Sequence, residues 1–157
     1  MTTAPPMTAE EFRSFGRGLL GEARELRLQL PADQKAPQLL ALVQASGNYQ
    51  IVTTSDGVPL QNEVAHIERL IREFDVVAAV VVSEVTYRAY DTDNPLAPPQ
   101  MAGEALQLTW FWPAAGVRES RLFDIVRTGA GVDLVANEAG LLPNARVPWL
   151  KALEAST

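Results

Sequence analysis

The chain contains no cysteine and a single histidine among its 157 residues. Without cysteine, disulfide bonds, thiol catalysis and thiolate metal sites are excluded. A chain that needs no disulfide suits a reducing compartment, so we expect a cytoplasmic protein.

Long apolar runs are also missing. The longest, Val76–Val82, is about a third of the ~20 residues that a membrane-spanning helix requires. The first eight residues lack the basic start and apolar core of a signal peptide. We therefore expect no contact with a membrane.

Basic residues are few, with 13 Lys and Arg against 19 Asp and Glu, which gives a net charge of −6. An acidic surface repels phosphate backbones, so we expect no nucleic-acid partner. Four arginines recur along one segment, but glutamates alternate with them, which is typical of a salt-bridged solvent face. These residues are Arg13, Arg17, Arg24 and Arg27 with Glu10, Glu11, Glu22 and Glu25.

The most informative segment is Asp75–Tyr90. Its first half is rich in valine and apolar on both faces, whereas its second half alternates, with Glu84, Thr86 and Arg88 on one side. This pattern predicts a strand that begins buried on both faces and ends with one face in water. We expect it to be the central strand of a sheet that helices cover.

Two segments have the spacing of amphipathic helices. Thr8 and Glu11 form a capping box before an apolar stripe that runs from Phe12 to Leu30 and stops at Pro31. A second stripe, with apolar residues at steps of three and four, covers 60–74 and leads directly into the valine-rich strand.

The remaining segments complete an α+β prediction. Leucines in 35–46 predict a shorter helix that Gly47-Asn48 closes, and the end of the chain from Val147 predicts another. Strand composition marks 49–54, 104–112 and 119–128, with 132–136 as one further short strand, and 91–103 reads as a long proline-rich connection. We expect a flexible tail at 1–7 and one domain at 8–157, in which a mainly antiparallel sheet of four or five strands packs against helices at about 9–30 and 60–74.

Gly16, Gly18 and Gly21 match the letters of a dinucleotide-binding motif. That motif needs its glycines between a strand and the start of a helix, whereas these lie inside a helix that is already capped. They favour close approach of another helix, for which a second copy of the chain is a natural candidate, or else a weak or kinked helix at Gly18. We expect no nucleotide cofactor.

Two other motifs have metal-site spacing. Glu63 and His66 lie one turn apart on a helix, but a carboxylate-bridged site needs a second such pair, and the chain has no other histidine. Asp91, Asp93 and Asn94 cluster oxygens, but the glycine and glutamate of a calcium loop are missing. We expect no metal and no other cofactor.

Glu84 and Asp124 are carboxylates within predicted strands. On one face of the sheet they could serve as an acid/base pair for hydrolysis, with His66 as a further candidate base. Cross-strand pairing of Glu84 with Arg121 or Arg127 is the ordinary alternative. No nucleophile elbow or phosphate loop accompanies them, so catalysis is not the favoured function.

The densest aromatic cluster is Trp110-Phe-Trp112. It forms either part of the core, where Trp149 could cover it, or a surface that binds a partner.

With few catalytic side chains and an acidic surface, the favoured hypothesis is a non-catalytic protein-interaction domain, namely a bacterial-type or phage-type adaptor, chaperone or inhibitor that forms a homodimer. Its predicted interface is Phe12, Gly16, Leu19 and Leu26, or Trp110 and Trp112. The alternatives are a small-ligand binder with 91–103 as a lid over the aromatic strand, and the hydrolase above.

Overall fold

The computed structural model describes residues 7–31, 34, 36–54, 61–89, 92–98, 100–129, 131–137 and 149–155, with backbone alone for 87–89 and 100–102. Its helices are α1 (Ala9–Gln29), α2 (Gln61–Glu73), the short 3-10 turn η1 (Pro113–Ala115) and α3 (Leu150–Ala155). Its strands are β1 (Gln38–Gln44), β2 (Tyr49–Thr54), β3 (Val76–Ala89), β4 (Gln100–Trp112), β5 (Val117–Thr128) and β6 (Gly131–Ala136). Within these residues no helix is long and apolar enough to cross a membrane.

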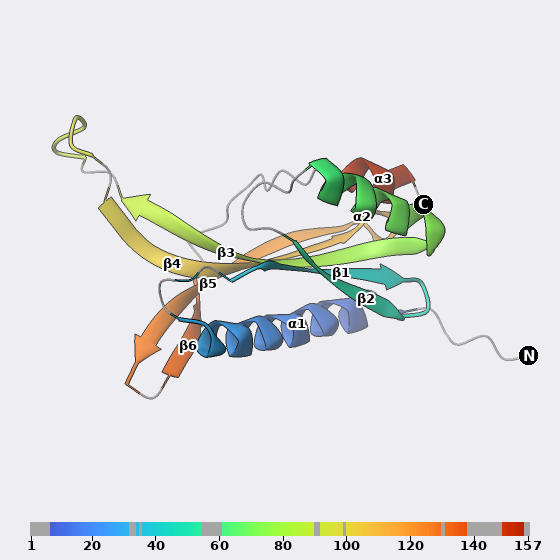
Figure 1. The fold of residues 1–157 in the computed structure, drawn as a ribbon, viewed down its shortest axis with the longest axis horizontal. Helices are drawn as coiled ribbons and strands as arrows, with labels where there is room; N and C mark the ends of the chain where they lie inside the picture. The colour runs from blue at the N-terminus through green and yellow to red at the C-terminus, as the bar shows by residue number, and fades with distance from the viewer. Residues whose placement is uncertain are drawn as a thin grey trace, which may run out of the picture.

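The described strands form one sheet in the order β2-β1-β3-β4-β5-β6, and every neighbouring pair is antiparallel. Helix α1 lies under one face, while α2 and α3 lie side by side over the other (Figure 1). The predicted α+β class and the antiparallel sheet are confirmed. The predicted count of four or five strands is too low, since the described residues form six.

The strand that the sequence analysis missed is β1. We predicted a helix over 35–46, but Gln38–Gln44 is a strand between β2 and β3. Its five central residues are all buried, so both faces are apolar and the segment has no period that could distinguish strand from helix. Gly47, at φ +92°, forms the tight turn into β2 rather than ending a helix.

The prediction for α1 is confirmed. Its capping box at Thr8 and Glu11 is present, and the helix ends at Gln29, before Pro31. The apolar stripe packs on the sheet face formed by alternate residues of β1, β3 and β4. The residues buried there are Phe12, Leu19, Leu20, Ala23, Leu39, Ala41, Val43, Ala78, Val80, Val82, Leu106, Leu108, Trp110 and Val117.

The opposite face has a second, smaller core under α2 and α3. Ile67 and Ile71 of α2 and Leu153 of α3 pack on Leu40, Leu42, Val81 and Phe111. Trp149 meets Phe111 edge to face, with ring centroids 6.1 Å apart. The aromatic cluster is therefore core on both faces, and Trp149 covers Phe111 rather than the two tryptophans.

Strand β3 occupies the predicted central place. Val80 is fully buried against the α1 face, and Val81 is buried against α2 and α3. Between α2 and β3 the chain turns at Asp75, whose φ of +50° is one that aspartate tolerates better than most residues. The short connection from α2 into β3 is thus as the sequence indicates.

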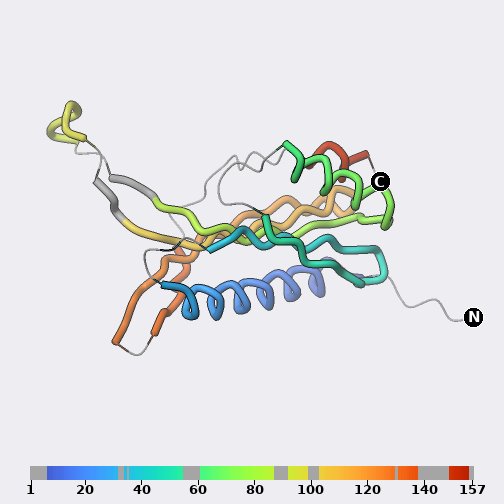
Figure 2. Tube along the Cα trace, viewed as in Figure 1, coloured from blue at the N-terminus to red at the C-terminus, as the bar shows by residue number. Residues whose placement is uncertain are grey.

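The outer parts of β3 and β4 form a long hairpin that projects from the body (Figure 2). Strand β4 begins at Gln100, so the connection predicted over 91–103 is shorter than expected. At the tip Leu96 is 93% exposed. Residues 1–6 of the predicted tail lie outside the described residues, while the backbone N–H of Met7 donates to the carbonyl of Ala45.

Candidate functional site

The structure does not bring the two candidate catalytic carboxylates together. In the strand register, Glu84 pairs with Leu106, and Leu106 with Phe123, whereas Asp124 pairs with Ala105. Directly paired residues point to the same face and successive residues to opposite faces. Glu84 and Asp124 therefore lie on opposite sides of the sheet, which is the wrong arrangement for an acid/base pair.

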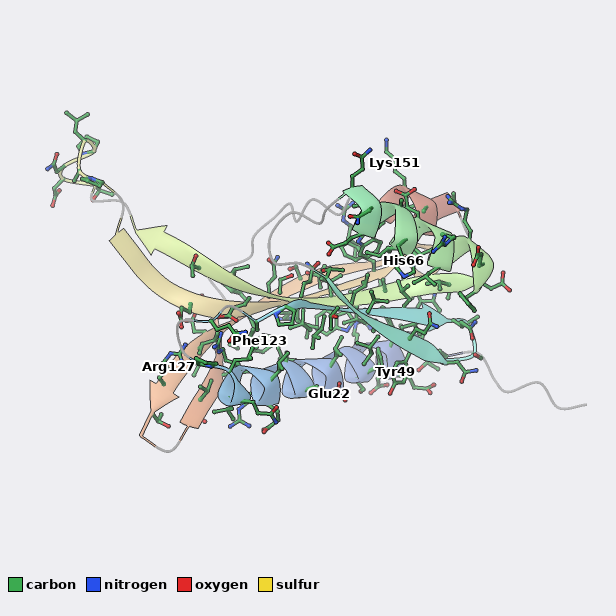
Figure 3. The ribbon with its side chains drawn as sticks, viewed as in Figure 1. Glu22, Tyr49, His66, Phe123, Arg127 and Lys151 are labelled. Atoms are coloured by element: carbon green, nitrogen blue, oxygen red, sulfur yellow. The ribbon has the colours of Figure 1, made fainter. Side chains whose placement is uncertain are left out.

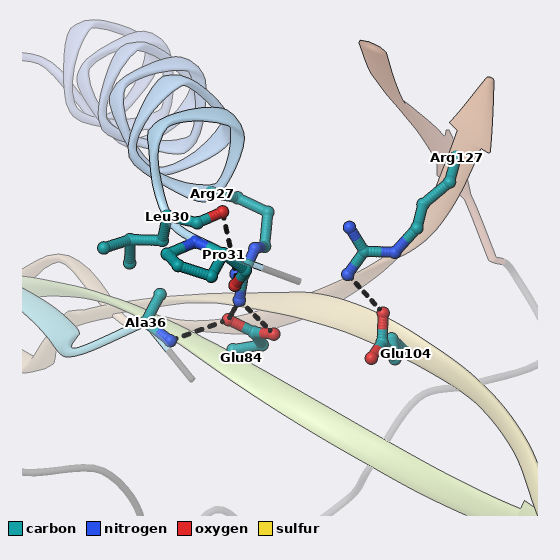
Figure 4. Close-up of polar contacts among 7 residues, drawn as sticks. All are labelled: Arg27, Leu30, Pro31, Ala36, Glu84, Glu104 and Arg127. Carbon is teal, nitrogen blue, oxygen red and sulfur yellow. Dashed lines mark hydrogen bonds and ion pairs between the residues drawn. The ribbon is translucent and has the colours of Figure 1, made fainter. Parts of the chain in front are cut away.

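Glu84 is buried and ion-paired (Figure 4). Both of its oxygens accept from Nη1 of Arg27 at 2.9 Å, and Oε2 also accepts from the Ala36 N–H at 3.0 Å. Nη2 of Arg27 donates to the carbonyl of Pro31. We predicted Glu84 on a wet face opposite Arg121 or Arg127, and Arg27 on the solvent face of its helix. Both predictions are wrong. The Arg27–Glu84 pair links the end of α1 to β3, and the Ala36 N–H bond links the segment before β1 to the same strand.

The other candidate catalytic residues stand apart. The side-chain amide of Asn137 donates to both oxygens of Asp124, at 3.1 and 3.2 Å. His66 is exposed on α2, on the far side of the sheet from α1, and its Nδ1 lies 3.0 Å from Nη2 of Arg69 (Figure 3). Among the described residues, no group of three or more acidic, histidine or cysteine side chains is placed to hold a metal.

The residues predicted to form a partner surface lie inside the molecule. Phe12, Leu19 and Trp110 are at most 3% exposed. The close approach that Gly16 permits is to Trp110 of the same chain, since a Cβ at Gly16 would lie 2.1 Å from the indole Nε1. Leu26 and Trp112 are partly buried against the same core, and Phe12 meets Trp112 edge to face at 5.5 Å. The two predicted surfaces cover each other, so neither is open to a partner.

The predicted lid does not reach the aromatic strand either. Trp110 pairs with Val80, while the hairpin tip follows Ala89. Nine residues of strand separate the two positions, or about 30 Å at ~3.3 Å per residue. The described residues 92–98 thus lie far from the tryptophans.

A different apolar surface is exposed at the sheet edge formed by β2. We call it the β2 surface, and it consists of Phe15, Tyr49 and Ile51. Tyr49 is 52% exposed and Ile51 42% exposed, and both point to the α1 side of β2. The ring of Phe15 lies 4.7 Å from that of Tyr49, centroid to centroid, which places Tyr49 beside α1 (Figure 3). A shallow groove of about 220 Å³ runs between this strand and the helix at Gly18.

The described residues of β2 lack the charges and the proline that commonly protect an edge strand. Its six residues, Tyr49–Thr54, include no charge and no proline, and among the described residues it pairs with β1 alone. Exposed edges commonly carry lysine, proline or a bulge to prevent pairing with another chain. The other edge, β6, carries Asp133, which faces Arg24 of α1 at 3.8 Å. Of the two edge strands, β2 is thus the one whose described residues carry no charge.

A second surface feature is an open groove of about 570 Å³ between α1 and β5, which we call the arginine groove. Its polar lining comes from Arg13, Arg17, Glu119, Arg121 and Asn137, and its apolar lining from Trp110, Leu122, Phe123 and Ala136. Glu119 accepts three hydrogen bonds from Arg13, the shortest 2.7 Å. These bonds are the main cause of a pKa of Glu119 below its ordinary value, and the charges of Arg13, Arg121 and Arg17 act in the same direction while burial opposes them.

The lowered pKa of Glu119 gives a pH prediction. The Arg13–Glu119 pair stabilises the fold above the ordinary glutamate pKa of 4.5, and this contribution is lost as the pH falls through the lowered pKa. Because both side chains are about a third exposed and solvent screens the pair, we expect its contribution to the stability to be small. An NMR titration of the Glu119 carboxyl should show the midpoint rising toward 4.5 in Arg13→Gln and staying low in the control Arg72→Gln. An unchanged midpoint in Arg13→Gln would contradict this assignment.

Sequence reasoning missed both surfaces. The absence of charge in the predicted strand Tyr49–Thr54 was a signal for the β2 surface. It was not usable, because the neighbouring segment 35–46 is predicted as a helix and β2 therefore has no predicted place in the sheet. The signal for the groove was the pair Arg13 and Arg17, one turn apart on one face of α1. Comparison of the chain with protein-family models, with curated proteins and with solved structures finds no match.

Proposed function

We propose that this protein is a non-catalytic protein-interaction domain that forms a homodimer by antiparallel pairing of β2 with β2 of a second copy. The observation that supports it is the uncharged edge strand β2, with Tyr49 and Ile51 half-exposed beside Phe15. Strand addition to an open edge is a recurrent mode of recognition, in which main-chain hydrogen bonds give affinity and side chains give specificity. The role of adaptor, chaperone or inhibitor remains part of the proposal.

The charge distribution favours a second copy as the occupant. With a net charge of −6, two copies repel each other over most of their surface. Strand β2 contributes no charge to that repulsion, so self-pairing is least opposed there. Two identical antiparallel strands also meet naturally about a two-fold axis, which gives the closed symmetry of most homodimers.

The expected contribution of the side chains is moderate. Full burial of a large apolar side chain is worth about 1.5–3 kcal/mol, so a half-exposed one gains about 1 kcal/mol when covered. Tyr49 and Ile51 from two copies together supply about 4 kcal/mol. Main-chain pairing adds to this sum, and the loss of rotational and translational freedom opposes it. A single charge in the strand should therefore abolish the dimer.

The test is Ile51→Lys, because a buried, unpaired ammonium opposes pairing at the centre of β2. We expect the wild type to be a dimer by light scattering at micromolar concentration, and Ile51→Lys to be a folded monomer. The matched control is Val135→Lys, which changes a valine that is 51% exposed on the opposite edge strand β6. We expect this variant to remain a dimer.

Two outcomes would overturn the proposal. A wild type that stays monomeric at millimolar concentration would remove the homodimer altogether. A dimer that survives Ile51→Lys but dissociates in Val135→Lys would move the interface to β6. Circular dichroism of each variant checks that the fold is intact.

A further inference from the structure

We propose that the arginine groove binds a small organic anion, in which a carboxylate or phosphate head is carried on an apolar body. The groove lies on the same face of the sheet as the β2 surface but toward the opposite edge, and this inference does not depend on the dimer. Within the described residues, the groove has unpaired arginine side chains at one point and apolar walls beside them. An amphiphilic anion can bind the arginines through its head and the apolar walls through its body.

The charge of the groove is not balanced within the described part of the chain. Arg13 is held by Glu119 at 2.7 Å. Arg17 and Arg121 are exposed and have neither a hydrogen-bond nor an ion-pair partner among the described residues. Three guanidinium groups therefore surround one carboxylate, in a protein whose net charge is −6. This local excess is of the sign that attracts an anion.

The register explains why the two free arginines face the same point. Phe12 contacts Trp112, and Gly16 contacts Trp110, so α1 runs opposite to β4 and in the same direction as β5. Four residues of helix advance about 6 Å and two residues of strand about 6.8 Å. The step from Arg13 to Arg17 thus matches the step from Glu119 to Arg121. Arg13 binds Glu119, and one helical turn further along α1 Arg17 lies at the same height along the sheet as Arg121.

The walls of the groove suit the apolar part of such a ligand. Trp110 lines it together with Leu122 and Phe123 of β5, and Phe123 is on the face toward α1 (Figure 3). The volume of about 570 Å³ falls within the range of small-molecule sites. Guanidinium groups bind carboxylates and phosphates through paired, charge-assisted hydrogen bonds. Glu119 in the same wall disfavours ligands of high negative charge.

The experiment titrates the full-length protein with octanoate, octyl phosphate, octanol and inorganic phosphate. Isothermal calorimetry gives the affinity, and NMR follows the indole N–H of Trp110, a residue that lines the groove. We expect octanoate or octyl phosphate to bind at one site, and octanol, which lacks the charge, to bind at least tenfold more weakly. The affinity should fall as salt is raised, because the attraction is electrostatic. Whichever of the two charged heads binds more tightly identifies the head group.

Arg17→Gln and Arg121→Gln should each weaken binding about tenfold, since each removes one charged donor. Arg72→Gln, a surface arginine of α2 on the other side of the sheet, is the control and should leave the affinity unchanged. Relief of like-charge repulsion should also leave both groove variants at least as stable to heat as the wild type, while inorganic phosphate raises the Tm of the wild type more than theirs.

The proposal is overturned if neither octanoate nor octyl phosphate binds, or if both bind equally well to the Arg17→Gln and Arg121→Gln variants. Binding of octanol with the affinity of octanoate would also overturn it, because the site would then be merely apolar. None of these outcomes bears on the dimer, which light scattering tests independently.

Discussion

Replacement of Arg27 by methionine is expected to destabilise the fold by about 3–5 kcal/mol. The change leaves the carboxylate of Glu84 buried with the Ala36 N–H as its one remaining hydrogen-bond partner among the described residues, and an unpaired buried charge has a cost of this size. It also releases the carbonyls of Pro31 and Leu30 from their donor. In a domain of this length the loss corresponds to a fall in Tm of roughly 10 °C, which thermal and denaturant unfolding would both detect.

Two further variants show whether the buried charge is the cause. The double variant Arg27→Met, Glu84→Leu removes both charges and should recover most of the lost stability, because apolar replacement of a buried pair is often neutral. Arg127→Met removes one partner of the exposed pair with Glu104, shown beside the buried pair in Figure 4, and should cost less than about 1 kcal/mol. Equal losses in Arg27→Met and Arg127→Met would show that the burial of the Arg27–Glu84 pair has no energetic consequence.

The second large effect is expected at Gly16. A Cβ there would lie 2.1 Å from Nε1 and 2.7 Å from Cε2 of Trp110, so Gly16→Ala must displace either α1 or the indole ring. Such overpacking costs about 1–3 kcal/mol, and it exceeds the helix propensity of about 1 kcal/mol that alanine gains over glycine. With that gain deducted, we expect Gly16→Ala to lower the free energy of unfolding by about 1–2 kcal/mol.

Gly18 provides the matched control, because it lies in the same helix and a Cβ there would meet nothing within 4 Å. Gly18→Ala should raise the free energy of unfolding by about 0.5–1 kcal/mol through helix propensity alone. The two substitutions, two residues apart, are thus expected to have opposite signs. A stabilising Gly16→Ala would mean that α1 does not lie against Trp110.

Much of the fold could be predicted from the sequence where a period was present. The steps of three and four in α1 and α2 and the valines of β3 each have one physical interpretation, and the structure has those elements. Gln38–Gln44 could not be assigned, because a strand buried on both faces has no alternation. Assigning it as a helix also concealed that β2 is an edge strand.

The burial and the partners of charged residues were the hardest features to predict from the sequence. Arg27 lies one turn beyond Ala23 on the buried stripe of α1, which was a usable signal, but its alternation with glutamates suggested a solvent face. Its partner Glu84 is 57 positions away in the chain, and only the tertiary fold brings the two together. For the same reason the predicted interface residues proved to be internal: apolar residues on a helix and on a strand do not reveal whether they cover each other or a second chain.

Hydrogen exchange of the β2 backbone amides, measured at low and at high protein concentration, tests the central claim most directly. Edge amides exchange rapidly when they face water and slowly once another strand accepts from them. We expect protection of 49–54 to increase with concentration in the wild type but not in Ile51→Lys, while 131–136 of β6 stays unchanged in both. Exchange in β2 that is independent of concentration, in a protein that light scattering shows to be dimeric, would contradict the proposed interface.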